Sequence, residues 1–325
     1  MGEDFRWQDG ERTIRFGRGA LADAPDLLGE GYTLLSTERA LAAAPQLAEA
    51  AAAVHHVAPG RVDEVAEDLR GTVEGELLVA LGGGRVVDVA KALAAAAGPP
   101  VRAAAVPTTL SAAEMTTVHR HAAGVDAATV RVRPAIVLND PALSASQPAA
   151  DLVASAANAL AHAVEAPATV LANPVATLAA LEGARQLVAG VEAGAEPDRD
   201  AVALGALLAG YASDSALYGL SHVMSQTLVR IGGAAQGPAN AAVLPVAMAA
   251  LEERLPERMR PVREAIGDAP VRLRDRAGIV GIRDLGVDRE ALAACADAAA
   301  ERAELHLTPP PASRDELLEL YEAAW

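Results

Sequence analysis

Cysteine and aromatic residues are scarce in this chain of 325 residues, which has one cysteine, Cys295, and 2% aromatic residues. A single cysteine excludes an internal disulfide, so we expect a protein of a reducing compartment, the cytoplasm. Hydrophobic residues still make up 52% of the sequence, and many of them are alanine. This composition favours helices that pack closely through small side chains over a sandwich rich in aromatic residues.

Positive charge is also in deficit, because 27 lysines and arginines face 43 aspartates and glutamates, and the formal net charge is −16. Such a chain is not expected to bind nucleic acid or an anionic membrane. No apolar run reaches the length of a membrane span. The polar first residues, MGEDFRWQDG, predict neither a signal peptide nor a myristoylation site. We therefore expect a soluble, cytoplasmic protein.

Lysine is almost absent, since only one of the 27 basic residues is a lysine, Lys91. A composition that otherwise uses arginine makes a specific role for this residue worth testing. Chance retention is the alternative, and the sequence leaves both open.

The first part of the chain alternates short apolar runs with helical patterns. The runs predict strands over residues 31–37, 76–84, 101–109 and 133–140. The helical patterns cover residues 38–54, 62–71 and 86–98. This alternation indicates a doubly wound, mostly parallel sheet, and an Asp-Gly turn predicts a hairpin before it. Only helical periodicity follows, so we predict an α/β domain over residues 1–146 and an all-α domain over residues 147–325.

Three glycines, Gly82, Gly83 and Gly84, lie between an apolar strand and a helix in LVALGGGRVVDVAKALA. A glycine turn at a helix N-terminus is a site for pyrophosphate, although a tight structural turn gives the same pattern. Thr108 and Thr109 follow the next strand, where open α/β sheets bind ligands. Asp88 and Lys91 are three residues apart on the helix, which also fits an ordinary surface ion pair.

A second cluster of polar residues lies in the helical domain. Asn158 and His162 in SAANALAHAVEA are four residues apart on one helix face, as are His222 and Gln226 in GLSHVMSQ. This is a spacing of metal ligands, but in each pair one member is an amide. Isolated helix histidines are more often satisfied core residues than ligands.

Other histidines and the cysteine carry weaker signals. His55 and His56 precede a Pro-Gly turn and are expected at the surface. His119 and His121 alternate, which favours a solvated hairpin. Cys295 lies on an alanine-rich helix and is expected to pack in the core.

The motifs GGGRVVDVAK, VPTTLSAAEMT, NDPAL, NALAHAVEA, GLSHVMSQ and GPANAAVLP occur in the order found in the iron-containing alcohol dehydrogenase superfamily, which the chain resembles along nearly its whole length. The branch it resembles most is that of the maleylacetate reductases. The resemblance implies the dehydroquinate synthase-like fold of this superfamily, with NAD or NADP bound in the cleft between the two domains. The residues it implies for cofactor binding are Ser36, Thr37, Gly82, Gly83, Gly84, Arg85, Asp88, Thr108, Thr109 and Leu143. No aspartate stands near Thr37 to repel a 2′-phosphate, which leaves NADP open.

Iron-dependent members of the superfamily bind metal with one aspartate and three histidines. The positions that match them here are Asn158, His162, His222 and Gln236. Two of these are amides, which are weak neutral ligands, so we expect no tightly bound metal. His222 is the expected proton donor or acceptor, His162 supports it, and Asn158 and Gln226 supply hydrogen bonds. Maleylacetate reductases usually keep histidine at positions 226 and 236, so a different substrate is expected.

Three functions follow from this resemblance. The first is a metal-independent NAD(P)-dependent oxidoreductase that acts on a carbonyl or alcohol, in the tailoring of a natural product or a peptide. The second is a lyase or cyclase on the same fold, as in dehydroquinate synthases. The third is a redox-silent partner or scaffold subunit. The resemblance also implies a homodimer, and a heteromer with another enzyme of its pathway is the alternative.

Overall fold

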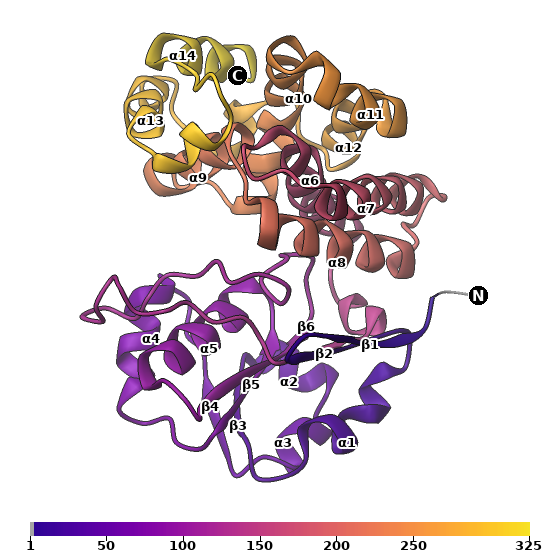
Figure 1. The fold of residues 1–325 in the computed structure, drawn as a ribbon, viewed down its shortest axis with the longest axis vertical. Coiled ribbons are helices and arrows are strands. Elements are labelled where there is room, and N and C mark those ends of the chain that lie inside the picture. Colours follow the sequence, from indigo (N-terminus) through magenta and orange to yellow (C-terminus); the bar gives the residue numbers. More distant parts are fainter. Residues whose placement is uncertain (1–2) are drawn as a thin grey trace. The chain divides into compact units, whose positions relative to one another are not determined.

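The computed structural model describes residues 3–325 and divides into two compact units, residues 1–146 and 147–325 (Figure 1). The first unit is α/β and the second is helical. The predicted fold class, a mostly parallel α/β unit followed by a helical unit, is confirmed.

The first unit is built on a seven-stranded sheet in the order β1-β2-β7-β6-β5-β3-β4. Its strands are β1 (Phe5–Asp9), β2 (Arg12–Phe16), β3 (Thr33–Ser36), β4 (Ala53–His56), β5 (Leu77–Gly82), β6 (Arg102–Pro107) and β7 (Ile136–Asn139). Its helices are η1 (Ala20–Asp23), α1 (Ala24–Leu28), α2 (Glu38–Ala43), α3 (Gln46–Glu49), α4 (Val62–Arg70), α5 (Gly84–Ala97) and η2 (Pro141–Ser144). The β1–β2 hairpin is antiparallel, as predicted from its Asp-Gly turn, and every other pair is parallel.

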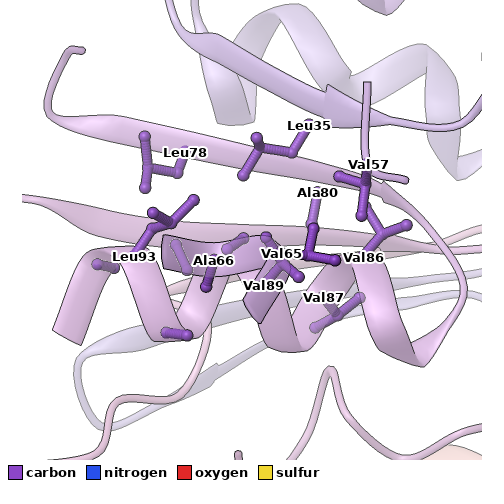
Figure 2. Packing of buried hydrophobic residues seen from close by; sticks show 14 of the residues in the cluster. Leu35, Val57, Val65, Ala66, Leu78, Ala80, Val86, Val87, Val89 and Leu93 are labelled. Atoms are coloured by element: carbon purple, nitrogen blue, oxygen red, sulfur yellow. The ribbon is translucent and has the colours of Figure 1, made fainter. Parts of the chain in front are cut away.

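Both faces of the central strands are buried, which explains why these strands are continuously apolar in sequence. Leu78 and Ala80 of β5 point to one face and pack with residues of α4 and α5, such as Val65 and Val89 (Figure 2). The residues between them point to the opposite face, where α1, α2 and α3 contribute side chains to a second core cluster. Alternate residues of each strand therefore anchor helices on opposite sides of the sheet.

The prediction of one helix over residues 38–54 is wrong. The segment forms α2, α3 and the strand β4, which pairs in parallel with β3. Pro45 lacks an N–H and follows Ala44, whose φ of −147° is not helical, so the helix ends there. The alanines after it favour a helix by intrinsic propensity, but pairing with β3 overrides that preference.

The strand order changes direction between β3 and β5. From this point the chain adds β4 on one side, and β6 and β7 on the other. The carboxyl ends of two strands on either side of such a switch point form the usual ligand crevice of an open α/β sheet. The residues after β3 and β5, Thr37 and Gly83, are therefore at this edge.

The second unit is a helical assembly in which a long α7 packs along α8. Its helices are α6 (Ala149–Glu165), η3 (Ala166–Ala168), α7 (Pro174–Glu192), α8 (Arg199–Ala216), α9 (Leu220–Gly232), α10 (Gln236–Arg254), α11 (Pro256–Ile266), α12 (Ala269–Arg276), η4 (Ile282–Leu285), α13 (Ala291–Ala300), η5 (Ala303–Leu307) and α14 (Arg314–Ala323). Among residues 3–325, no single helix is both long and apolar enough to cross a membrane, and only the bent pair α8 and α9 passes that test jointly.

Candidate functional site

The glycine turn of the first unit leads from β5 into α5. Gly82 has a φ of +158°, and a Cβ there would meet Val86 at 2.7 Å. A Cβ on Gly84 would meet the Ser111 side chain at 2.7 Å. Gly83 is the N-cap of α5, and no side chain caps it. The glycines therefore bring the turn close to the segment after β6, and they leave the first amides of α5 open to an anion.

The two threonines after β6 lie against this turn. The Thr108 amide donates a 3.0 Å hydrogen bond to the carbonyl of Gly82. A Cβ on Gly83 would lie 3.1 Å from Thr109 Oγ1. The structure thus brings both threonines together with the glycine turn, as the predicted phosphate site requires.

Ser36 and Thr37, the residues predicted to face the adenine ribose, have structural partners. The buried Ser36 hydroxyl donates to the carbonyl of Leu81 at 2.8 Å and so ties β3 to β5. The Thr37 hydroxyl accepts from the amide of Ala40 at 3.3 Å and caps α2. Both residues lie at the switch-point edge, and their contact with a nucleotide stays a prediction.

The remaining predicted cofactor residues differ in exposure. Arg85 lies on the first turn of α5 and is exposed, so its charge can reach an anion at the helix N-terminus. Leu143 lies in η2 and is 6% exposed, as part of the second core cluster. Asp88 is partly exposed and pairs with Lys91 at 2.9 Å. The alternative of an ordinary surface ion pair is wrong, because the Lys91 side chain is fully buried.

In the second unit, α6 and α9 place two histidine rings face to face. The ring centroids of His162 and His222 are 3.9 Å apart and the planes are inclined by 28°. Tyr218 contacts both rings, at 6.2 Å from His162 and 5.0 Å from His222. The two histidines singled out from the sequence therefore form one buried aromatic cluster.

A carboxylate that the sequence analysis did not single out, Glu165, orients His222. Its Oε2 lies 2.5 Å from His222 Nδ1, and its Oε1 accepts the amides of Gly219 and Ser221 at 3.1 and 2.6 Å. A carboxylate only accepts hydrogen bonds, so Nδ1 carries the hydrogen and Nε2 faces away from Glu165. Nε2 is buried and has no hydrogen-bond partner among the described residues. Glu165 follows His162 by three residues in HAVE, but no sequence pattern links it to His222, which lies 57 residues away.

His162 is held as a neutral ring. Its Nδ1 lies 3.0 Å from the hydroxyl of Ser213. Burial lowers the pKa of His162 well below its ordinary value, and the neighbouring His222 lowers it further. A neutral His162 does not repel a proton on the ring stacked against it.

The amides predicted at this site are fixed by separate contacts. Asn158 Oδ1 accepts from Asn240 Nδ2 at 2.8 Å. Gln236 Nε2 donates to Ser225 Oγ at 3.0 Å, and Gln226 Oε1 accepts from Arg302 at 2.9 Å.

Burial raises the pKa of Tyr218, and a hydrogen bond with Gln226 opposes this rise. The sequence analysis did not single out the three partners of these amides, which are Asn240, Ser225 and Arg302.

The donor set in the second unit does not fit tightly bound iron or zinc. Imidazole nitrogens bind zinc at about 2.0–2.1 Å through lone pairs in the ring plane, and two rings stacked nearly parallel do not aim those lone pairs at one point. Asn158 and Gln236 supply neutral amides instead of an anion and a third imidazole. Within residues 3–325, no three His, Cys, Asp or Glu side chains gather as a metal-binding group.

The expectation of a solvated hairpin at His119 is wrong. His119 is 5% exposed, its Nε2 accepts from the amide of Val132 at 3.2 Å, and burial lowers its pKa to about 4. This hydrogen bond connects residues 119 and 132, which lie in the long irregular segment between β6 and β7. Cys295 is fully buried, as expected, and burial raises its pKa to about 11.

Comparison with known proteins places these features in context. Residues 152–325 match the Fe-containing alcohol dehydrogenase family, C-terminal. A maleylacetate reductase of Pseudomonas knackmussii is 32% identical over 287 residues, which cover 84% of this chain and 80% of that protein. A maleylacetate reductase of Agrobacterium tumefaciens has a similar structure, with a TM-score of 0.84 and 26% identity over 100% of this chain and 99% of that one. An iron-containing alcohol dehydrogenase of Corynebacterium glutamicum gives a TM-score of 0.83 and 28% identity over 99% and 97% of the two chains.

Proposed function

Because the chain belongs to the Fe-containing alcohol dehydrogenase family and is an NAD(P)-dependent oxidoreductase related to the maleylacetate reductases, we propose that it works without a tightly bound metal. Its substrate is a carbonyl compound or the corresponding alcohol. The altered donor set favours a substrate of specialised metabolism, such as a natural product or a modified peptide.

The observation that carries this proposal is the pairing of Glu165 with His222. The carboxylate holds Nδ1, so Nε2 is the atom that exchanges a proton. In the direction of reduction, Nε2 donates its proton to the carbonyl oxygen as that oxygen becomes an alcohol. Glu165 stabilises the positive ring before the transfer, and the neutral His162 does not oppose it. Protein groups thereby take over the polarising role that a metal ion has in iron-dependent relatives.

Residues of the first unit fit a dinucleotide. The uncapped N-terminus of α5 and the close glycine turn suit a pyrophosphate, and Arg85 adds a positive charge beside it. Thr108 and Thr109 offer hydroxyls at the same edge. When bound, the nicotinamide supplies or accepts the hydride. Asn158 and Gln226 of the second unit are proposed to hydrogen-bond the substrate.

The proposal is tested by titrating chelator-treated protein with NADH and NADPH, followed by nicotinamide fluorescence, with metal content measured on the same sample. We expect saturable binding of at least one nucleotide to metal-free protein. Maleylacetate and a panel of small ketones and aldehydes are then screened with the nucleotide that binds. Absence of binding by both nucleotides would overturn the oxidoreductase proposal and favour a partner or scaffold subunit. Loss of turnover on chelation, with recovery on adding iron or zinc, would overturn metal independence.

A further inference from the structure

The segment between β6 and β7 is unusual because it is irregular and yet buried. Residues 108–135 contain no helix or strand, and residues 112–116 are all buried. A buried irregular backbone must find hydrogen-bond partners that a helix or sheet would otherwise provide. Long irregular loops inside compact domains are usually functional or disordered. We call residues 110–118 the buried loop.

Lys91 supplies three of these partners. Its Nζ donates to the carbonyls of Ala113, Thr116 and Val118 at 2.9, 3.0 and 2.8 Å. The same ammonium pairs with Asp88 Oδ1 at 2.9 Å, and its side chain is fully buried. One side chain of α5 therefore fixes three carbonyls of the buried loop.

A second buried cation holds the loop from β2. Arg12 is fully buried, and its Nη1 donates to the carbonyl of Met115 at 2.8 Å while Nε pairs with Asp9 at 2.7 Å. Two cations from separate elements thus bind four carbonyls of the loop. The charge of each cation is balanced by an aspartate on its own hairpin or helix.

The buried loop lies in close contact with the glycine turn. Ala112 has a φ of +61°, a strained conformation for a residue with a Cβ. The neighbouring Ser111 lies so near Gly84 that only a glycine fits there. Strain of this kind persists only where the surroundings impose it, and Lys91 binds the carbonyl of the next residue, Ala113.

We propose that Lys91 is a positioning residue for the nucleotide site. It ties the buried loop to the same helix whose N-terminus faces the phosphates, so Thr109 and Ser111 stay beside the glycine turn before any nucleotide arrives. A preformed site binds its ligand more tightly than one that must be ordered on binding. This inference rests on the proposed nucleotide-binding function of the first unit.

The chemistry of the contact explains why an arginine-rich chain keeps one lysine. An ammonium is a compact group with three hydrogens directed to different sides, which suits the carbonyls of three residues, and its charge is balanced by the nearby Asp88 carboxylate. A guanidinium is planar and larger, so it does not reach the same acceptors within a closed pocket. Lys91→Arg is therefore expected not to replace lysine, although it keeps the charge.

The first test needs no change at position 91. Native protein is treated with an amine-acylating reagent and the modified sites are mapped by mass spectrometry, beside Arg70→Lys, which adds a lysine at a position whose side chain is 42% exposed. We expect the introduced lysine to react at least about 100-fold faster than Lys91, because a buried, hydrogen-bonded amine is inaccessible. Equal rates would overturn the assignment of Lys91 to a closed pocket.

The second test compares Lys91→Met and Lys91→Arg with wild type. We expect both to raise the Kd for NADH or NADPH about tenfold or more, and to speed tryptic cleavage after the exposed Arg120. Gly205→Ala, whose added Cβ would clash with the backbone of α7 in the second unit, controls for a general loss of stability and should change neither readout. The KM for the nucleotide is expected to rise more than kcat falls.

The outcomes separate this inference from the function it rests on. If wild type binds no nucleotide, the proposed function fails, while amine protection and tryptic cleavage still decide whether Lys91 holds the loop. If wild type binds nucleotide and Lys91→Met or Lys91→Arg binds it equally well, positioning by Lys91 is overturned and the proposed function stands.

Discussion

At the scale of single residues, Glu165 decides which nitrogen of His222 is available. Its Oε1 accepts amides at the start of α9, and its Oε2 holds Nδ1 of the ring. The carboxylate therefore stabilises a helix N-terminus and a histidine at once. Its burial makes both contacts strong, since no water competes for them.

Glu165→Gln is predicted to lower kcat by about 10²–10³-fold while the fold is kept. The glutamine oxygen can still accept the α9 amides, but its NH₂ group would donate to Nδ1. His222 would then carry its hydrogen on Nε2 as a neutral ring, and that ring is a poor proton donor. Steady-state kinetics with the identified substrate measures the effect, and circular dichroism checks the fold.

The matched control for this change is Glu316→Gln, a partly exposed carboxylate on α14 that pairs with Arg254. It removes a charge from the same unit and is expected to leave kcat unchanged. If Glu165→Gln kept a kcat within about twofold of wild type, His222 would not be the proton donor.

Glu114 gives a prediction about pH. It is 1% exposed, its Oε2 has no hydrogen-bond partner among the described residues, and burial raises its pKa from 4.5 to about 7. A raised folded-state pKa contributes stability that is fully present below pH 4.5 and is lost as the pH rises through 7. Glu114→Gln is therefore expected to be more stable than wild type at about pH 9, by up to about 3 kcal/mol.

Urea unfolding at about pH 4 and about pH 9 measures this difference. The free energies of unfolding of Glu114→Gln and wild type should nearly coincide at the lower pH and separate at the higher one. Glu76→Gln, at an exposed position, should show no such separation. A pH-independent difference for Glu114→Gln would mean that the carboxyl group keeps an ordinary pKa in the folded protein.

At the scale of elements, α7 and α8 approach so closely that their backbones touch. A Cβ on Gly205 would meet the carbonyl of Gly183 and the amide of Leu187, both at 2.7 Å. These are backbone atoms, which cannot turn aside as a side chain can. Small residues at this contact, Gly183 and Gly205, allow the close helix packing that the composition predicted.

Gly205→Ala is predicted to lower the free energy of unfolding by about 1–3 kcal/mol. Alanine gains about 1 kcal/mol over glycine in a helix interior, but the clash with α7 outweighs this gain. Chemical denaturation measures the loss. The comparison variant is Gly194→Ala, whose Cβ would meet only the carbonyl of Glu196 at 3.8 Å. Equal stability of the two variants would contradict the close contact of α7 and α8.

Elements with a regular pattern were predictable from the sequence, and those held by distant partners were not. The runs of β5 and β6 and the helix α5 are local patterns, so they were found. β4 was missed because its alanines favour a helix and only the pairing with β3 makes it a strand. The burial of His119 was missed because the long segment around it is held by Lys91 and Arg12, which lie far away in the sequence.

The candidate site was predictable to the same extent. His162 and His222 were found as members of helical motifs, and the structure stacks them. Glu165 was missed because its partner lies 57 residues away, and no spacing rule connects a carboxylate with a histidine on another helix. The cofactor residues of the first unit are a prediction that nucleotide binding will test.

At the scale of the whole molecule, the proposed metal independence depends on a few side chains, while the fold is shared with the relatives. The two units keep an architecture that matches a maleylacetate reductase with a TM-score of 0.84. The four positions that the resemblance assigns to a metal come from three helices, α6, α9 and α10. If the backbone still supports the ancestral geometry, side chains alone decide whether metal binds.

The double variant Asn158→Asp with Gln236→His is therefore predicted to gain a metal site. It restores one carboxylate and a third imidazole beside His162 and His222, and the new carboxylate could still accept the Asn240 amide. The histidine rings must rotate out of their stack, which is a small cost against the affinity of four such ligands. Metal analysis after purification in iron or zinc should give close to one ion per chain for the variant and far less for wild type.

Thermal unfolding gives a second readout for the same variant. Saturating metal, at about 100 times its Kd, should stabilise the double variant by about 2.7 kcal/mol, and chelator should reverse the gain. Wild type should show neither response. Adding His162→Ala to the double variant removes one ligand and should abolish the gain, which ties the effect to this site. Stoichiometric metal in wild type would instead mean that Asn158 and Gln236 are adequate ligands and that the metal-independent mechanism is wrong.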